Sequence, residues 1–147
     1  MDAIKLLKED HQKFKKLLGE LEDTTERGIK TREKLLEQLK AELKPHEAAE
    51  EEVFYPALIE RLKDDDIVRE GYEEHHAADV LMEELEDVPF DDERWGPKMK
   101  VIKENIEHHI EEEEGPMFKQ ARKALTPDEL EELGARMEER MKAGAAR

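Results

Sequence analysis

One short pattern occurs twice in this chain and limits how the chain can fold. In each copy a histidine is followed by a glutamate four residues later, by a second glutamate beside it, and by apolar residues about two turns on; the copies begin at His46 and His109. On an α-helix, residues i and i+4 lie on one face, one turn apart. Each copy therefore predicts a helix that presents an imidazole and a carboxylate together. Two such helices facing each other would form a box of nitrogen and oxygen donors suited to two first-row metal ions.

The composition narrows the class of protein. The 147 residues fit one domain with a sizeable core. The sequence has no cysteine, which excludes disulfides, thiolate metal sites and cysteine nucleophiles. A net charge of −16 argues against nucleic acid and acidic membrane surfaces as partners. No apolar run reaches the length of a membrane span or a signal-peptide core. We therefore expect a soluble, cytoplasmic, helical protein.

Apolar residues spaced alternately three and four apart predict five helices, and no strand pattern is present. The apolar stripes cover residues 4–21, 36–57, 68–85, 95–117 and 130–141. Short connections between long helices imply antiparallel neighbours, so we predict an all-α, up-down-up-down four-helix bundle over residues 1–125. Residues 126–147 should form an amphipathic C-terminal helix packed on the outside of the bundle.

Local signals refine the helix ends. Asp2 is a plausible N-cap for the first helix, and Thr126 with Glu129 forms a capping box around Pro127. Pro45 falls inside the second helix and removes a backbone hydrogen bond, so we expect a kink or a restart there. The pair Gly115-Pro116 should disturb the fourth helix near its end.

Four of the six histidines fall in register with the apolar stripes, one on each bundle helix. With a rise of 1.5 Å per residue, they and two glutamates can converge on one layer of the core; the six residues are His11, His46, His75, His109, Glu50 and Glu113. An unpaired buried carboxylate costs several kcal/mol and would normally protonate or move outward. Two carboxylates in one layer need compensation, and a pair of metal ions supplies it.

Taken singly, each of these residues has a plainer explanation. A lone His11 is more often a hydrogen-bonded core histidine, and His46 with Glu50 could be a surface pair one turn apart. His76 and His108 lie about 100° from the inward face, and we expect them to be solvated. The metal interpretation depends on the repeated pattern and the two lone histidines together.

The combination resembles the hemerythrin-like HHE cation-binding domains over nearly the whole chain. The motifs that carry the resemblance are Asp10-His11, His46-Glu47-x-x-Glu50-Glu51 with Phe54-Tyr55-Pro56, Glu74-His75, and His109-x-x-x-Glu113-Glu114 with Met117-Phe118. The resemblance implies two iron ions, bridged by an oxo or hydroxo group, inside a four-helix bundle, with one open or labile coordination position. It implies that one iron is held by His11 and His46. It implies that the other is held by Glu47, His75 and His109, and that the two irons are bridged by Glu50 and Glu113.

One departure from the oxygen-carrying hemerythrins bears on function. Those proteins have a second histidine one turn after the position of His75, whereas this chain has Asp79 there. Glu47 takes the place of the missing ligand, as in the HHE branch. More anionic oxygen donors stabilise the ferric state. We therefore expect a centre that reacts with or senses O2, NO or peroxide, or responds to iron or redox state, rather than one that stores oxygen reversibly.

Several alternatives stay open at this point. A peroxide-dismutating, catalase-like di-iron enzyme would use the same ligands, and a metal-free helical interaction module would use none of them. A sensor domain would need a separate partner protein. A ferritin-like site needs Glu-x-x-His on two helices, and only Glu73-x-x-His76 matches; a zincin needs a histidine where Glu50 stands. Tyr72 is either a hydrogen-bond donor to a metal-bound ligand or a core aromatic.

Overall fold

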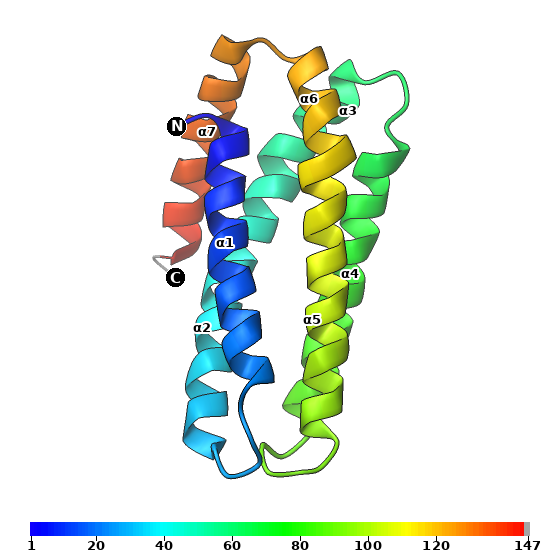
Figure 1. Cartoon of the computed structure of the whole chain (residues 1–147). Coiled ribbons are helices and arrows are strands. Elements are labelled where there is room, and N and C mark those ends of the chain that lie inside the picture. Colours follow the sequence, from blue (N-terminus) through cyan, green and yellow to red (C-terminus); the bar gives the residue numbers. More distant parts are fainter. Residues whose placement is uncertain (146–147) are drawn as a thin grey trace.

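A computed structural model describes residues 1–145 of the chain, and it is helical apart from short connections (Figure 1). The elements are α1 (Ala3–Glu22), α2 (Ile29–Ala49), the π-helical turn η1 (Glu50–Phe54), α3 (Tyr55–Arg61), α4 (Asp66–Glu86), α5 (Trp95–Glu112), the π-helical turn η2 (Glu113–Met117), α6 (Phe118–Ala124) and α7 (Pro127–Ala145). The last two residues of the predicted C-terminal segment lie outside the described part of the chain.

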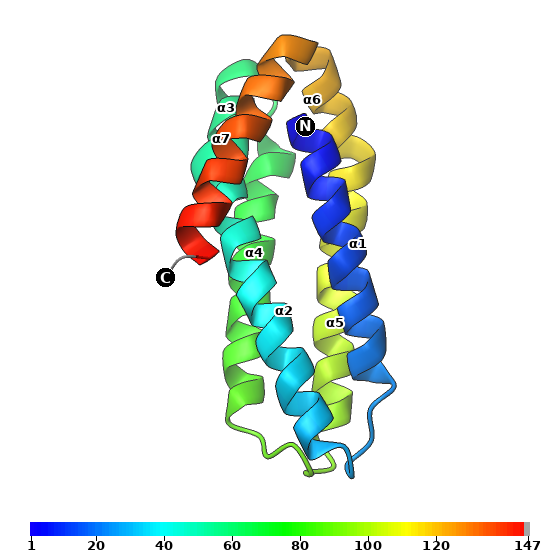
Figure 2. The same ribbon diagram turned by 90° about the vertical axis from the view of Figure 1, so that its left-hand side faces the viewer.

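The long helices alternate in direction and form a four-helix bundle. Figure 1 shows α1 and α5 in front, with α2 and α4 behind them, and the turned view of Figure 2 shows α1 and α5 on the right and α2 and α4 on the left. Helix α1 packs on α2 and α5, and α4 packs on α5. Helix α7 then runs back along the outside of α1 and α2. The predicted all-α bundle with an extra outer helix is confirmed.

The bundle consists of two halves with the same order of elements. In the first half α1 and α2 lead through η1 into α3, and in the second half α4 and α5 lead through η2 into α6. Both π-helical turns are five residues long and both short helices are seven. The repeated sequence pattern therefore marks a repeated structural unit, in which residues around the two copies of the pattern have counterparts in the other half.

The helix-end signals act as predicted. The Asp2 side chain accepts a hydrogen bond from the backbone N–H of Lys5, which caps α1. Thr126 and Glu129 exchange hydrogen bonds between side chain and backbone at the start of α7. Both caps satisfy N–H groups that have no partner within the helix.

The second helix departs from α geometry later than expected. Helix α2 continues through Pro45 to Ala49, so no restart occurs at the proline. A proline removes only one N–H from the helix, and this helix continues through it. The change to π geometry comes at Glu50, where a wider turn re-aims the side chains that follow. In the second half the expected disturbance at Gly115-Pro116 is confirmed, since both residues lie inside η2.

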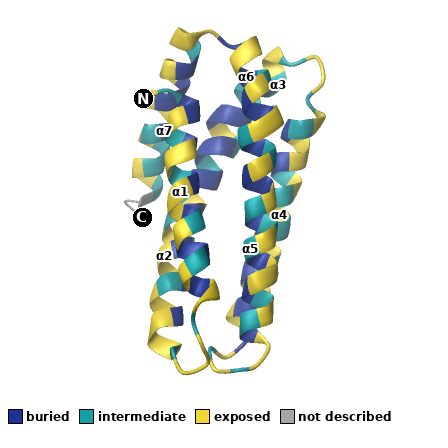
Figure 3. Cartoon of the chain, viewed as in Figure 1, coloured by how far each residue is buried: buried dark blue, intermediate teal, exposed yellow. Residues whose placement is uncertain are grey.

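The apolar core is split into two clusters by a layer of polar side chains. One cluster joins the start of α1 to η1, α3, α6 and the buried face of α7, through residues such as Ile4, Phe54 and Leu133. The other fills the opposite end of the bundle, around Leu39 and Trp95. Figure 3 shows buried residues along the inner faces of the helices. Within residues 1–145, no helix combines the length and hydrophobicity that crossing a membrane requires.

Candidate metal centre

The polar layer contains every candidate ligand predicted from the sequence. Among the described residues, eight polar or charged ones are buried: His11, Arg32, His46, Glu47, Glu50, His75, His109 and Glu113. Arg32 lies elsewhere, where its guanidinium stacks 4.4 Å above the Trp95 ring and donates to Phe90 O. The other seven are the predicted ligands. Glu50 and Glu113 are completely shielded from solvent.

The four imidazoles direct their Nε2 atoms at the two central glutamates. His11 and His109 lie 3.0 and 3.3 Å from Glu113 oxygens, respectively. His46 and His75 each lie 3.1 Å from Glu50 Oε1. Candidate ligand atoms within 4.8 Å of one another form two groups, His11-His46-Glu50-Glu113 and Glu50-His75-His109-Glu113. The two glutamates belong to both groups, so the layer contains two adjacent donor sets that share their carboxylates.

The outer nitrogen of each imidazole is held by a further carboxylate. The Nδ1 atoms of His11, His46, His75 and His109 lie 2.7, 2.9, 2.8 and 2.7 Å from oxygens of Glu114, Asp10, Glu51 and Glu74. An imidazole whose Nδ1–H donates to a carboxylate keeps Nε2 free for a metal and has its ring orientation fixed. These carboxylates occupy equivalent positions in the two halves of the bundle. Asp10 on α1 corresponds to Glu74 on α4, and Glu51 in η1 corresponds to Glu114 in η2.

Without a metal, the layer would hold protons in place of cations. Burial alone would lower the pKa of His46, but the charge of Glu50 and the hydrogen bond to Asp10 raise it to about 10. Burial likewise works against the charged forms of His75 and His109, but hydrogen bonds to nearby glutamates and the charges of those glutamates raise their pKa values to about 9 and about 11. Burial disfavours the Glu113 carboxylate, yet the charge of His109 keeps its pKa well below the usual value. The layer is thus an array of ion pairs that favours positive charge between the carboxylates.

Glu47 occupies a different position from the other candidate ligands. Its carboxylate lies 3.8 Å from Nδ1 of His75, not on the Nε2 side where the shared glutamates lie. It forms a separate group with Glu51 and His75. Burial raises the pKa of Glu47 to about 8, and a hydrogen bond with Asp79 adds to the shift. Asp79, which stands where the oxygen carriers have a second histidine, therefore contacts Glu47, the residue expected to replace that ligand.

Tyr55 reaches the centre, and the sequence interpretation missed it in favour of Tyr72. The Tyr55 hydroxyl donates to Glu113 and lies 3.5 and 3.4 Å from Nε2 of His75 and His109. Burial and the nearby carboxylates raise the Tyr55 pKa well above its usual value, so the phenol keeps its proton. Tyr72 instead donates to the backbone carbonyl of Glu51, 3.0 Å away. Tyr55 follows Glu50 by five residues, a spacing that faces the centre only because η1 is a π-helical turn.

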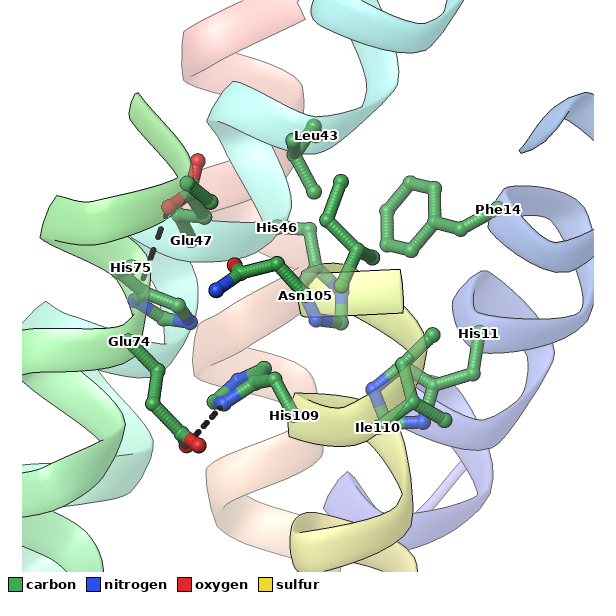
Figure 4. A pocket seen from close by; sticks show the side chains of 12 residues that line it. His11, Phe14, Leu43, His46, Glu47, Glu74, His75, Asn105, His109 and Ile110 are labelled. Carbon is green, nitrogen blue, oxygen red and sulfur yellow. Dashed lines mark hydrogen bonds and ion pairs between the residues drawn. The ribbon is translucent and has the colours of Figure 1, made fainter. Parts of the chain in front are cut away.

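A small cavity borders the four imidazoles. Its volume is about 20 Å³, which is room for about one water-sized molecule. Figure 4 shows the histidines together with Glu47, Glu74 and Asn105 around this space, and apolar side chains such as Phe14 and Leu43 complete the wall. Neither shared glutamate lines it. A larger groove of about 520 Å³ runs along the surface between α2, α4 and α7, and Leu43 and Glu47 line both spaces.

The remaining histidines are outside the centre, as expected. His76 is exposed, and the His108 side chain is 64% exposed, 3.9 Å from Glu74 and Glu112 oxygens. The four outer carboxylates were visible in the sequence as acidic neighbours of the candidate ligands, but only the structure shows that each serves a histidine on another helix.

Comparison with known proteins agrees with this arrangement. The family model for the hemerythrin HHE cation-binding domain matches residues 2–121. A crystal structure of a hemerythrin HHE cation-binding domain-containing protein from Mycobacterium kansasii, described as an Rv2633c homolog, superposes with a TM-score of 0.88 and 27% sequence identity; the match covers 99% of this chain and 88% of that one. No curated protein shows significant sequence similarity. With four inward histidines, two shared glutamates and a family match over most of its length, the chain belongs to the hemerythrin HHE cation-binding domain family.

Proposed function

We propose that this protein binds two iron ions in its polar layer and uses them to react with or sense O2, NO or peroxide, or to respond to iron or redox state. The convergence of four Nε2 atoms on two shared carboxylates carries the proposal. His11 and His46 would hold one ion, and His75 and His109 would hold the other. Glu47, whose carboxylate lies beside Nδ1 of His75, would have to turn toward this second ion to join them. Glu50 and Glu113 bridge the two ions.

An unpaired atom supports the fit of the residues to a metal pair. Glu50 Oε2 is buried and has no hydrogen-bond partner among the described residues. A carboxylate oxygen without a partner in the core costs a few kcal/mol, and a cation between the two glutamates would satisfy it. Four imidazole nitrogens with carboxylate oxygens form a donor set that suits iron. The outer carboxylates add the partners that orient ligating histidines.

Bound iron supplies reversible electron transfer and an acceptor for small oxygen or nitrogen ligands. The protein contributes the rest. The two apolar clusters exclude water from above and below the layer. The cavity beside the histidines is small, about 20 Å³, so it favours compact ligands over larger molecules. The three glutamates favour the ferric state, which fits a redox or gas response better than oxygen storage.

Peroxide dismutation is a second candidate, and Glu47 favours it. In this alternative Glu47 moves protons and does not hold iron. Its carboxyl lines the cavity and has a pKa of about 8, so it can hold and release a proton near neutral pH. Dismutation oxidises one hydrogen peroxide to oxygen and reduces a second to two waters, so two electrons and two protons pass from the first to the second and no other reactant is needed. The iron pair would carry the electrons, and a side chain such as Glu47 would carry protons. Rapid oxygen evolution from peroxide that is lost in Glu47→Gln, with the iron content retained, would establish this activity.

Metal analysis tests the main proposal directly. We expect two irons per chain in the purified protein and visible absorption bands that change with oxygen, peroxide and nitric oxide. His46→Ala should lose iron and lower the melting temperature by roughly 5 °C or more, because bound metal stabilises the folded state. His76→Ala is the matched control, since this histidine is exposed. If His46→Ala and His76→Ala behave alike, the metal-free interaction module is the better description.

A further inference from the structure

Asn105 brings to the cavity an amide whose carbonyl oxygen has no hydrogen-bond partner among the described residues. The residue lies on α5, one turn before His109, and lines the cavity with the four candidate histidines. Figure 4 shows its amide reaching from α5 into the space that His46, His75 and Glu47 also line. The rest of the wall is either ionisable or apolar, so among the lining residues Asn105 supplies the only amide.

The amide is incompletely satisfied. Asn105 Oδ1 is buried and has no hydrogen-bond partner among the described residues. A buried polar atom without a partner destabilises the folded state, and an apolar side chain of the same size would remove that cost. The adjoining cavity can hold one water-sized molecule. A small guest in this cavity would have the amide on one side and the imidazoles on the other.

The two halves of the bundle differ at this position. The counterpart of Asn105, one turn before His46, is Glu42. Glu42 also has a buried oxygen without a hydrogen-bond partner in the described chain, but it does not line the cavity. Only the second half therefore directs a neutral donor and acceptor at the cavity. This asymmetry distinguishes a ligand contact from a general feature of the helices.

We propose that Asn105 hydrogen-bonds the outer end of a small exogenous ligand that enters this cavity, and so makes the centre selective for compact hydrogen-bonding ligands such as hydroperoxide or azide. The amide can donate through its NH2 to either ligand. Its Oδ1 can accept only from hydroperoxide, which carries an O–H, since azide has no hydrogen to donate. Nitric oxide accepts hydrogen bonds weakly and should gain little from the contact. The inference rests on the proposed metal centre and adds the residue that discriminates among its ligands.

Two probes on the iron-loaded protein test this: azide with the oxidised form and nitric oxide with the reduced form, each titrated by visible spectroscopy. Asn105→Leu, which keeps the branched shape and removes the amide, should weaken azide binding about 5- to 10-fold, as expected for one lost hydrogen bond, and change nitric oxide affinity by less than about twofold. Asn105→Asp, which keeps the shape but replaces the donor with an acceptor, should weaken azide at least as strongly. Glu42→Leu is the matched control and should change neither affinity by more than about twofold.

The metal-free protein gives an independent reading. Because Asn105→Leu removes a buried unsatisfied oxygen, it should raise the melting temperature of the metal-free chain while it weakens azide binding. Equal azide affinities in wild type and Asn105→Leu, with iron present in both, would overturn the role of Asn105 and leave the metal centre intact. A wild-type protein that holds no iron would overturn the metal centre, and this inference with it.

Discussion

The Tyr55 ring lies directly against Gly71. A Cβ atom on Gly71 would lie 2.9 Å from the Tyr55 hydroxyl oxygen and 3.0 Å from two ring carbons. On its other side the same hydroxyl donates to Glu113 in the polar layer. The absence of a side chain on α4 thus leaves room for a phenol that contacts a candidate bridging ligand.

Gly71→Ala should therefore affect the centre although residue 71 is not a ligand. The added methyl group must push the Tyr55 ring away or separate α4 from it, and such overpacking costs about 1–3 kcal/mol. We expect a lower melting temperature and altered visible bands in the iron-loaded protein. Gly19→Ala is the control, because a Cβ there meets nothing within 4 Å; it should stabilise α1 by about 0.5–1 kcal/mol. Unchanged bands in Gly71→Ala would show that Tyr55 does not influence the metals.

The carboxylates behind the histidines should control how tightly the metals bind. Glu74 lies 2.7 Å from Nδ1 of His109 and holds that ring with Nε2 toward Glu113. Glu74→Gln keeps the shape but removes the charge, and loss of such a partner lowers metal affinity about 10- to 100-fold. Competition with a chelator measures the change. Glu73→Gln removes the same charge from the exposed neighbouring position and should leave the affinity as it is. Equal affinities in the two variants would contradict the orienting role.

The sequence was sufficient to predict the bundle and the burial of the candidate ligands, because both follow from the 3.6-residue repeat of the helix. Apolar spacing located the helices, and the register of His11 and His75 with that spacing brought them to the layer. A residue on the inward face of a helix, between two apolar clusters, must lie in the layer that separates them. The capping box at Thr126 could also be predicted, because its two hydrogen bonds join residues only three apart in the sequence.

Features that depend on π geometry or on contacts between helices were not predictable in this way. Tyr55 follows Glu50 by five residues, which would not share its face on an α-helix, and the turn η1 carries no proline or glycine to reveal it. Pro45 predicted a kink or restart at residue 45, whereas the helix changes geometry only at Glu50. The sequence did not single out Asn105, because only the assembled bundle shows which side chains border a cavity.

The metal-free protein should be most stable at mildly acidic pH. The raised pKa values of His46, His75 and His109 give stability that is complete below the unfolded value of about 6.5 and is lost as pH rises through about 9 to 11. The raised pKa of Glu47, about 8, also makes stability fall as pH rises above about 4.5. The lowered pKa of Glu113 gives stability that is present above about 4.5 and lost as pH falls.

Thermal unfolding with a chelator should therefore give the highest melting temperature between about pH 4.5 and 6.5 and a steady decline toward pH 9. Iron loading should reduce this decline, because metal binding requires the deprotonated ligands and strengthens as pH rises. A metal-free chain more stable at pH 9 than at pH 5.5 would show that the layer does not hold protons in place of cations.

Helix α7 should depend on close contact with the N-terminus of the chain. A Cβ atom on Gly134 would lie 2.1 Å from the Met1 carbonyl oxygen, and this neighbour is backbone that cannot rotate away. Gly134→Ala should separate α7 from the start of α1, which hydrogen exchange would detect as lost protection in α7. Ala135→Val adds bulk at the next, exposed position and should leave α7 protected. We predict from this contact that residues 126–147 unfold together with the bundle of residues 1–125.

Small ligands should reach the cavity through the groove between α2 and α4. Leu43 and Glu47 border both the groove and the cavity, so the Leu43 side chain forms part of the wall between them. Leu43→Ala should thin this wall and speed azide binding to the oxidised, iron-loaded protein in stopped-flow measurements. Leu39→Ala is the matched control: Leu39 is buried on the same helix, one turn away, and lines neither space. Both changes should cost about 2–5 kcal/mol of stability, so a rate increase confined to Leu43→Ala would reflect access. Equal rates in the two variants would place the entry route elsewhere.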